Sequence, residues 1–415
     1  MKKRVLIIGG GASGMMAAVQ AARSKAKVTI IEHTSQVGKK LLSTGNGRCN
    51  LTNLYQAPEC YRCGQDGFVQ ETLKKFSMED TLAFFRDLGI LLKDRQGYVY
   101  PNSDQAVTVL EGFQAELGRL GVQVILNCNV EKILCKNMFE VYTDQKILKG
   151  DALILAAGSK AAKFTGSDGS GYELAKQLGH TIVSPLPALV QLQCKEKHYK
   201  QLAGVRTEAK VQLMVCENKR EAGWKVLAED VGELQLTDYG ISGIPTFQVS
   251  RYASVSLHKG LDVKVKIDFL PQQSVREVED LISLGIRNFG YKTWEQWITG
   301  VLNKKLGIVL LKLAQLNPNE TVSSSSESQR KKLLRQIKSY ETIVTEVNPF
   351  EKAQVCCGGV AVSEICSKTM ESKNMQGLYF AGEIVDVDGI CGGYNLQWAW
   401  SSGATAGRSA GAFAD

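Results

Sequence analysis

The 415-residue sequence predicts an α/β fold in which buried parallel strands alternate with helices around a long insertion. KRVLIIG (3–9) is typical of a buried parallel strand, and a helix-forming run, ASGMMAAVQAARSKA (12–26), follows it. A second buried strand, KVTIIE (27–32), comes next. GLYFAGE (377–383) indicates a further strand of the same sheet far along the chain, so the main domain is predicted to be discontinuous.

The pattern of elements divides the chain into four segments. Residues 1–185 and 346–415 are interpreted as the first and second parts of the main domain. Several short strand patterns predict a β-rich insertion over residues 186–270. A capping box formed by Ser274 and Glu277 opens a helical region, residues 271–345, that we expect to form a lid.

Bulk composition is that of an ordinary globular protein, with 44% hydrophobic and 22% charged residues. The sequence contains no apolar run of membrane-spanning length, and its first apolar run is too short for a signal peptide. We therefore expect a cytoplasmic location with mostly reduced thiols among the eleven cysteines. CYRC (60–63) is interpreted as two loop thiols, because no second ligand pair has zinc-site spacing, and no metal site is expected.

The net charge of +8 comes from lysines and arginines that are mixed with acids along the whole chain. The sequence shows no basic block with interleaved aromatic residues, the pattern that is typical of nucleic-acid binding. We expect a small-molecule substrate, no nucleic-acid partner, no membrane partner, and a monomer or homodimer.

Three glycines after the first strand, Gly9, Gly11 and Gly14, have the spacing G-x-G-x-x-G. Gly9 permits a tight turn, Gly11 lets the backbone approach a pyrophosphate, and Gly14 lets the helix pack closely on the strand. The helix N-terminus would face the phosphates with the positive end of its dipole. Glu32, at the end of the second strand, would accept hydrogen bonds from a ribose 2′-hydroxyl. Together these features predict a Rossmann-type dinucleotide site.

The surrounding segments favour FAD over NAD as the dinucleotide. After Glu32, residues 33–53 form a Gly/Asn/Arg-rich segment that could wrap a large ring. Near the end of the chain, Glu383 at a strand end would bind ribitol hydroxyls. A glycine-rich loop, 389–393, precedes a helix predicted from about Asn395. The N–H groups of this helix would point at the pyrimidine edge of a flavin and favour negative charge there.

Two further segments are expected beside the cofactor. DALILAAGS (151–159) indicates a strand that ends in a small-residue turn, and Val130 would lie beside the adenine. The complete set of residues predicted to bind FAD is Gly9, Gly11, Ala12, Ser13, Gly14, Glu32, His33, Lys40, Gly45, Asn46, Gly47, Arg48, Asn50, Val130, Ala157, Gly158, Gly382, Glu383, Gly393, Asn395 and Leu396.

Two side chains are candidates for catalysis. Arg48 carries a fixed positive charge suited to a flavin or a developing oxyanion, and its alternative role is a structural ion pair. Tyr394 follows two glycines at the expected flavin-facing turn, where it would act as a proton donor or simply pack on the ring.

Five motifs resemble the YhiN-type (BaiN-like) family of FAD-dependent oxidoreductases, which is related to the glutathione-reductase and fumarate-reductase superfamily. They are GGGASG (9–14), GNGRCNLTN (45–53), SDGSGYELAKQLGH (167–180), GELQLTDYGISGIP (232–245) and AGEIVDVDGICGGYNLQWAWSSG (381–403). The resemblance implies FAD held without a second nucleotide domain, so that NADH or NADPH would visit the flavin only transiently.

The family includes a bile-acid 3-oxo-dehydro reductase and an aminoacetone oxidase. The resemblance therefore implies an FAD-dependent oxidoreductase acting on a CH–CH group, with NAD(P)H driving reduction of a C=C bond conjugated to a ketone in a steroid or bile-acid-like enone. Two alternatives remain open at this point: an FAD-dependent oxidase of a small amine such as aminoacetone, and a non-catalytic flavin-binding redox sensor.

Overall fold

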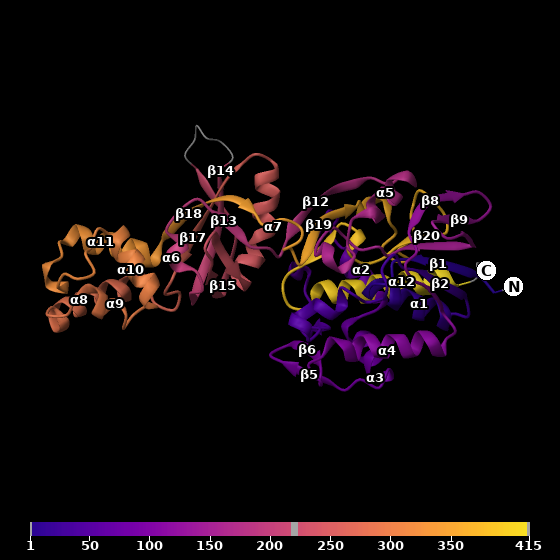
Figure 1. Ribbon diagram of the computed structural model, residues 1–415, viewed down its shortest axis with the longest axis horizontal. Helices are drawn as coiled ribbons and strands as arrows, with labels where there is room; N and C mark the ends of the chain where they lie inside the picture. Colours follow the sequence, from indigo (N-terminus) through magenta and orange to yellow (C-terminus); the bar gives the residue numbers. More distant parts are fainter. Residues whose placement is uncertain (1, 217–222, 413–415) are drawn as a thin grey trace. The chain divides into compact units, whose positions relative to one another are not determined.

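The computed structural model describes residues 2–216 and 223–412, and the chain forms two compact units. Unit 1 comprises Met1–Leu186 and Gln354–Asp415, and unit 2 comprises Pro187–Ala353 (Figure 1). Unit 1 therefore contains both ends of the chain, with unit 2 inserted between its two parts. None of the described helices is long and apolar enough to cross a membrane.

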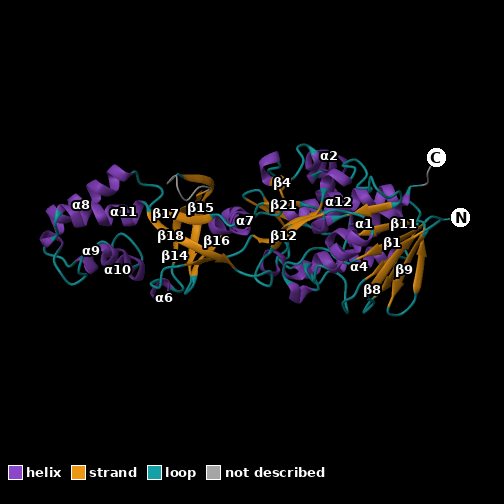
Figure 2. Ribbon diagram, turned by 90° about the horizontal axis from the view of Figure 1, so that it is seen from above, coloured by secondary structure: helices purple, strands orange, loops and turns teal. Residues whose placement is uncertain are grey.

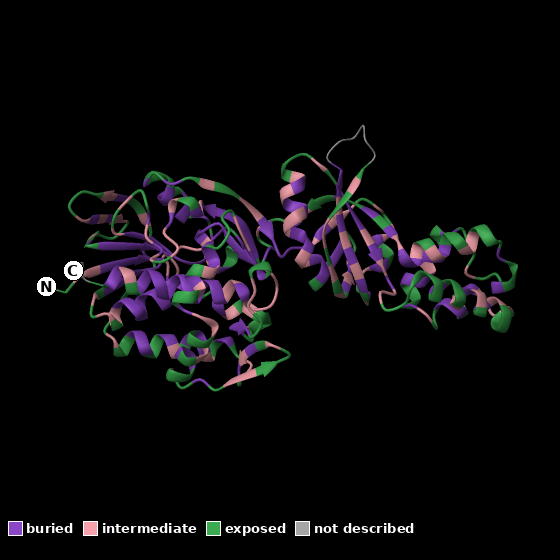
Figure 3. Ribbon diagram, turned by 180° about the vertical axis from the view of Figure 1, so that it is seen from behind, coloured by how far each residue is buried: buried purple, intermediate pink, exposed green. Residues whose placement is uncertain are grey.

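Unit 1 is organised around a five-stranded sheet in which each strand runs parallel to its neighbours. In spatial order the strands are β20 (Leu378–Phe380), β11 (Ala152–Leu155), β1 (Arg4–Ile8), β2 (Lys27–Ile31) and β7 (Gln123–Ile125). Burial is nearly complete along the central strands, where the apolar runs of the sequence lie (Figure 3). The predicted Rossmann-type α/β fold is confirmed.

The remaining elements of unit 1 surround this sheet. Its helices are α1 (Ala12–Arg23), α2 (Phe68–Lys75), α3 (Met78–Asp87), α4 (Ala106–Arg119), α5 (Ser170–Gln177) and α12 (Tyr394–Gly411). One three-stranded sheet contains β8 (Val130–Cys135), β9 (Phe139–Thr143) and β10 (Ile147–Gly150), and another contains β3 (Thr52–Asn53), β5 (Leu92–Arg95) and β6 (Tyr98–Pro101). Two further sheets have two strands each: β4 (Tyr61–Cys63) pairs with β21 (Val387–Gly389), and β12 (Ile182–Ala188) pairs with β19 (Val355–Val360).

Helices α1 and α12 run side by side in the same direction and touch through their backbones. A Cβ placed on Gly403 would lie 2.4 Å from the carbonyl oxygen of Ser13, and one on Gly407 would lie 2.3 Å from that of Ala17. Gly411 makes the same approach to Ala21. Because the glycines recur every four residues, they occupy one face of α12, and no other residue would allow this spacing.

Unit 2 contains a closed barrel and a group of helices (Figure 2). The barrel strands, in spatial order, are β13 (Leu192–Cys194), β16 (Gly240–Gly243), β15 (Trp224–Leu236), β14 (Arg206–Cys216), β17 (Asp262–Asp268) and β18 (Tyr340–Val347). The helices are α6 (Tyr199–Leu202), α7 (Ile244–His258), α8 (Val275–Phe289), α9 (Trp294–Ile298), α10 (Lys304–Leu313) and α11 (Glu327–Lys338).

Two features of unit 2 differ from the sequence-based interpretation. Helix α7 lies within the segment predicted as a β-rich insertion, because tertiary packing of Val249 and Ala253 against the barrel overrides a weakly amphipathic sequence. The range 271–345 ends not in helix but in strand β18 from Tyr340, which alternates buried and exposed residues and completes the barrel.

The contact between α1 and α12 generates a stability prediction. Gly407→Ala would push a methyl group into the α1 backbone, so we expect the free energy of unfolding to fall by about 1–3 kcal/mol. Gly118→Ala on the exposed face of α4 is the matched control, because its Cβ meets nothing within 4 Å and should be neutral or stabilising by about 0.5–1 kcal/mol. Urea unfolding followed by tryptophan fluorescence measures both; equal effects would contradict the close packing.

Candidate functional site

The turn between β1 and α1 has the geometry of an anion cradle. Gly9 leaves the strand with a φ of +101°, and a Cβ on it would lie 2.4 Å from the carbonyl oxygen of Ala156. A Cβ on Gly14 would lie 1.9 Å from the carbonyl oxygen of Gly9. Gly11, by contrast, is the N-cap of α1 and faces open space, with no atom within 4 Å of an added Cβ. A pyrophosphate would fit there, against the first N–H groups of the helix, which have no intrahelical acceptor.

Glu32 is fixed at the carboxyl end of β2. It is 7% exposed, and its Oε2 accepts a hydrogen bond from the Gly10 N–H at 2.7 Å. Its Oε1 accepts from the Thr34 N–H at 2.8 Å, and the Nδ1 atom of His33 lies 3.4 Å from the same oxygen. Each carboxylate oxygen has a second lone pair, which suits the acceptor that a ribose hydroxyl requires.

A second carboxylate, Glu383, lies just beyond strand β20. Its Oε2 forms an ion pair with the Lys40 Nζ at 2.6 Å, and both side chains are largely buried. Within the described part of the chain, its other oxygen, Oε1, is buried without a hydrogen-bond partner. Because an unsatisfied buried carboxylate oxygen is costly, this atom marks a position where a ligand hydroxyl, such as that of a ribityl chain, fits.

Tyr172 on α5 was not among the predicted site residues. Its hydroxyl is buried without a partner among the described residues, and its side chain is 2% exposed. Burial raises the pKa of this phenol, and electrostatic interactions with the Cys356 and Glu383 side chains raise it further. It therefore stays neutral and can donate a hydrogen bond beside Glu383. The sequence carried no signal for it beyond the motif SDGSGYELAKQLGH that contains it.

The N-terminus of α12 is held from three sides. Gly393 is its N-cap with a φ of +97°, and a Cβ there would lie 2.7 Å from the backbone carbon of Thr52. The Asn395 side chain accepts from the Gly389 N–H at 2.8 Å and donates to the Gly389 carbonyl at 2.9 Å. The Asn50 amide oxygen, in the orientation that satisfies its neighbours, accepts from the Gly393 N–H at 3.2 Å. The helix N-terminus is thus a rigid set of donors.

The loop between Thr44 and Asn50 adopts an unusual backbone. Gly45, Asn46, Gly47 and Cys49 all have φ between +55° and +81°. For the non-glycine residues this conformation costs about 1–2 kcal/mol each, which indicates a functional constraint. The loop presents Arg48 to solvent while Cys49 is fully buried, and burial raises the pKa of the Cys49 thiol to about 12. Cys49 is therefore a packing residue, and Arg48 is the exposed cation of the loop.

Tyr394, the first residue of α12, is 4% exposed. Its ring packs edge to face against Tyr61 with the centroids 5.7 Å apart, and its hydroxyl contacts the Cys60 thiol. Burial raises the pKa of Tyr394, so its phenol stays protonated at neutral pH. A Cβ on Gly392 would lie 3.0 Å from Tyr98 and 3.2 Å from Tyr394, so the turn is enclosed by tyrosines.

The other predicted residues also belong to unit 1. Ser13 donates to the Ala381 carbonyl at 3.2 Å, and a Cβ on Gly382 would lie 2.4 Å from the Ser13 hydroxyl oxygen, so these two segments meet beside α1. The remaining members are Ala12 at the start of α1, Ala157 and Gly158 directly after β11, Val130 at the start of β8, and Leu396 in the first turn of α12.

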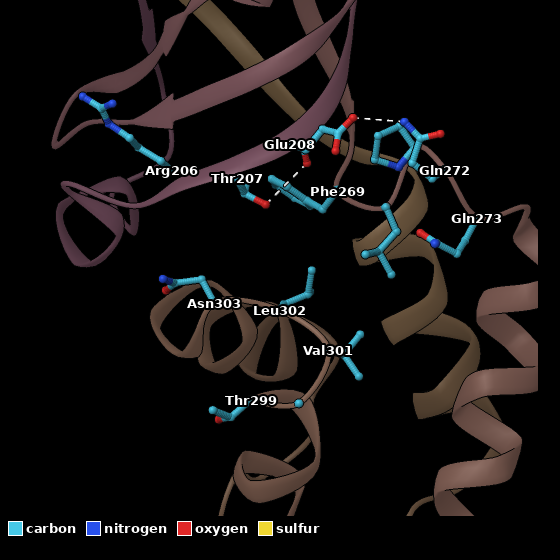
Figure 4. A pocket seen from close by; sticks show the side chains of 13 residues that line it. Arg206, Thr207, Glu208, Phe269, Gln272, Gln273, Thr299, Val301, Leu302 and Asn303 are labelled. Atoms are coloured by element: carbon cyan, nitrogen blue, oxygen red, sulfur yellow. Dashed lines mark hydrogen bonds between the residues drawn. The ribbon is translucent and has the colours of Figure 1, made fainter.

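Unit 2 has a separate pocket of about 390 Å³ between the barrel and the helices, and it contains none of the predicted site residues (Figure 4). Its wall includes a hydrogen bond of 3.0 Å from the Gln272 amide to Glu208. Across residues 2–216 and 223–412, no group of three or more His, Cys, Asp and Glu side chains is arranged to hold a metal ion.

Fold and geometry define a dinucleotide-binding protein of the Rossmann type, and the donor set fits FAD. Gly11 and the N-terminus of α1 would hold the pyrophosphate, Glu32 the adenosine ribose, and Glu383 a ribityl hydroxyl. The N-terminus of α12 would face the ring. The family described as HI0933-like protein Rossmann domain matches residues 3–409, so the chain belongs to that family. The resemblance seen in the sequence motifs is confirmed.

Two relatives match over nearly their whole length. The chain is 45% identical over 410 residues to a protein of Clostridium scindens named 3-dehydro-bile acid delta(4,6)-reductase, covering 98% of both chains. It is 29% identical over 408 residues to a protein of Haemophilus influenzae named ribosomal RNA dihydrouridine synthase, covering 96% of both. Among solved structures, a flavocytochrome c3 fumarate reductase is similar with a TM-score of 0.48 and 15% identity, covering 99% of this chain and 78% of that one.

The open space beside Gly11 generates a prediction about the cofactor. Gly11→Val would place its Cβ in that space with no protein atom within 4 Å, so we expect the fold to survive while FAD binds at least tenfold more weakly, a change of about 1.4 kcal/mol. Gly118→Val is the matched control, since its Cβ also meets nothing within 4 Å. Flavin absorbance of the purified proteins and FAD titration measure the effect; full FAD content in Gly11→Val would refute this placement of the pyrophosphate.

Proposed function

We propose that the protein is an FAD-dependent oxidoreductase that reduces a C=C bond conjugated to a ketone, with a steroid or bile-acid-like enone as substrate and NADH or NADPH as transient electron donor. The observation that carries the proposal is the 45% identity, from end to end, to a relative named as a bile-acid reductase. The motifs 45–53 and 381–403, which surround the proposed flavin position, lie within the matched region.

FAD, when bound, supplies hydride chemistry, and the chain supplies binding, orientation and charge. Reduction adds a hydride to the β-carbon of the enone and a proton to the α-carbon, and the electrons come from NAD(P)H. Arg48, the exposed cation of the 44–50 loop, would stabilise the negative charge that develops on the carbonyl oxygen. Tyr394, protonated at neutral pH because burial raises its pKa, would supply the proton.

A second candidate substrate is a uracil base in RNA, which the 29% identity to a relative named ribosomal RNA dihydrouridine synthase favours. The C5=C6 bond of uracil is conjugated to the C4 carbonyl, so hydride addition to the β-carbon and protonation of the α-carbon would yield dihydrouracil. The same residues would perform the same chemistry on either substrate. The two candidates differ only in what the protein must bind next to the flavin.

An anaerobic titration tests the electron donor and the substrate together. We expect NADH or NADPH to bleach the flavin absorbance, and a steroid 4-en-3-one to restore it with formation of the saturated ketone. Uridine and a uridine-containing RNA serve as competing acceptors in parallel samples. Re-oxidation by RNA alone would replace the first candidate with the second, and the absence of bleaching by either nucleotide would contradict the proposed electron donor.

The role of Tyr394 is tested by Tyr394→Phe. We expect flavin bleaching by NAD(P)H to keep its rate, whereas re-oxidation by the substrate slows about 10²-fold, the lower range for loss of a general acid. Tyr61→Phe is the control, because this neighbouring ring packs on Tyr394 and its hydroxyl donates to Gln56 at 2.7 Å. Stopped-flow absorbance resolves both half-reactions, and equal slowing in the two variants would assign Tyr394 a packing role only.

A further inference from the structure

The helical part of unit 2 is strongly basic. Residues 271–338 contain eleven lysines and arginines and six aspartates and glutamates, so the net charge of this segment is +5. The net charge of the whole chain is +8. This segment holds helices α8 to α11 (Figure 1). The proposed reduction uses only residues of unit 1, so it gives this charge no role.

The outward side of helix α11 concentrates these cations. Ser328, Lys331, Lys332 and Arg335 are exposed and recur at the spacing of a single helical face, while Leu333 and Ile337 are buried on the other side. We call this set the basic face. With Glu327 at its start, it lines a shallow hollow of about 520 Å³.

The charges of the basic face are available for a ligand. Two acids act on the basic face: Glu279 of α8 interacts electrostatically with Lys331, and Glu327 pairs with it at 2.6 Å. The side chains of Glu327 and Lys331 are about 70% exposed, so this pair adds little stability and can be exchanged. The Lys332 amino group donates to the side chain of Gln315. Within the described part of the chain, Lys332 and Arg335 form no ion pair.

A second feature is RNFGYK (287–292), the last residues of α8 and the turn after it, which we call the aromatic turn. Tyr291 is 76% exposed, and Phe289 is 38% exposed. The Lys292 Nζ lies 4.8 Å from the centre of the Phe289 ring, a cation–π contact. Exposed aromatic rings between cations provide flat surfaces on which bases can stack.

The two features are joined in the fold. The Val322 N–H donates to the Lys292 carbonyl at 2.9 Å, and the Ser323 hydroxyl donates to the Gly290 carbonyl at 3.0 Å. Residues 322–324 then lead into α11, where the Arg330 guanidinium donates to the Ser325 carbonyl at 3.0 Å. The aromatic turn is thus anchored beside the start of the helix that carries the basic face.

We propose that the basic face and the aromatic turn together bind RNA, with phosphates on Lys331, Lys332 and Arg335 and unstacked bases on Tyr291 and Phe289. Charge complementarity carries the choice of partner. A membrane surface fits less well, because the hollow lined by Glu327, Ser328, Lys331, Lys332 and Arg335 has no apolar side chain to enter lipid and the aromatic turn adds only the rings of Tyr291 and Phe289. The expectation of no nucleic-acid partner is replaced by this proposal, which concerns a surface of unit 2 and holds for either candidate substrate of unit 1.

Binding of a fluorescein-labelled single-stranded RNA of mixed sequence to the FAD-loaded protein tests the proposal. We expect the variant K331Q/K332Q/R335Q to bind at least tenfold more weakly and to reduce the slope of log affinity against log salt by about 2, because three phosphate contacts are lost. Tyr291→Ala should weaken binding about tenfold and leave the salt slope unchanged, because stacking is not ionic. Fluorescence anisotropy at several salt concentrations measures both quantities.

The matched control is K74Q/K75Q/R86Q, which removes three exposed cations of unit 1 and changes the net charge equally. Equal weakening in this control, or no RNA binding by the wild-type protein at low salt, would overturn the proposal. Binding to phosphatidylglycerol vesicles but not to RNA would also overturn it, in favour of a membrane surface. Reduction of a steroid enone is assayed separately on K331Q/K332Q/R335Q and should equal that of the wild type, so failure of the proposed reaction and failure of this surface are distinguishable.

Discussion

The arrangement of the cofactor site depends on the backbone contact between α1 and α12. Gly403, Gly407 and Gly411 let the two helices lie closer than side chains would allow, and this fixes their register. From that register, α12 begins eight residues before the level at which α1 begins, about 12 Å at 1.5 Å per residue. Two positive helix termini are therefore held at a set separation, and with FAD bound one would face the pyrophosphate and the other the ring system.

Two carboxylates of the site, Glu32 and Glu383, differ in how their oxygens are satisfied. Glu32 is satisfied by two backbone N–H groups and is ready to accept from a ligand without rearrangement. Glu383 is balanced on one side by Lys40 and leaves one oxygen unsatisfied. A buried oxygen in this state suits a position where the hydroxyl of a bound ligand would complete its hydrogen bonding.

Unit 2 is organised around a closed barrel, whereas unit 1 is organised around a parallel sheet. Its barrel is closed by β18, a strand that lies far along the chain from β13 and pairs with it directly. The helices α8 to α11 are inserted between β17 and β18, and their Trp294, Leu306 and Leu333 belong to the same buried core as the barrel strands. Their outer surface is consequently free to carry charge, and it is there that the lysines and arginines of α11 gather.

The dinucleotide-binding half of the protein is predictable from local sequence patterns. A strand, three glycines, a helix and an acid follow one another within thirty-two residues. Their spacing alone predicts the tight turn at Gly9, the close helix–strand packing at Gly14 and the open backbone at Gly11. Only the tertiary structure shows the non-local features: the unpartnered hydroxyl of Tyr172 beside Glu383, helix α7 inside the β-rich insertion, and the hydrogen bonds that join the aromatic turn to Val322 and Ser323 ahead of α11. A hydrophobic period of 2 or 3.6 residues predicts a single strand or helix. The features above arise from contacts between elements distant in the sequence, and such a period carries no information about those contacts.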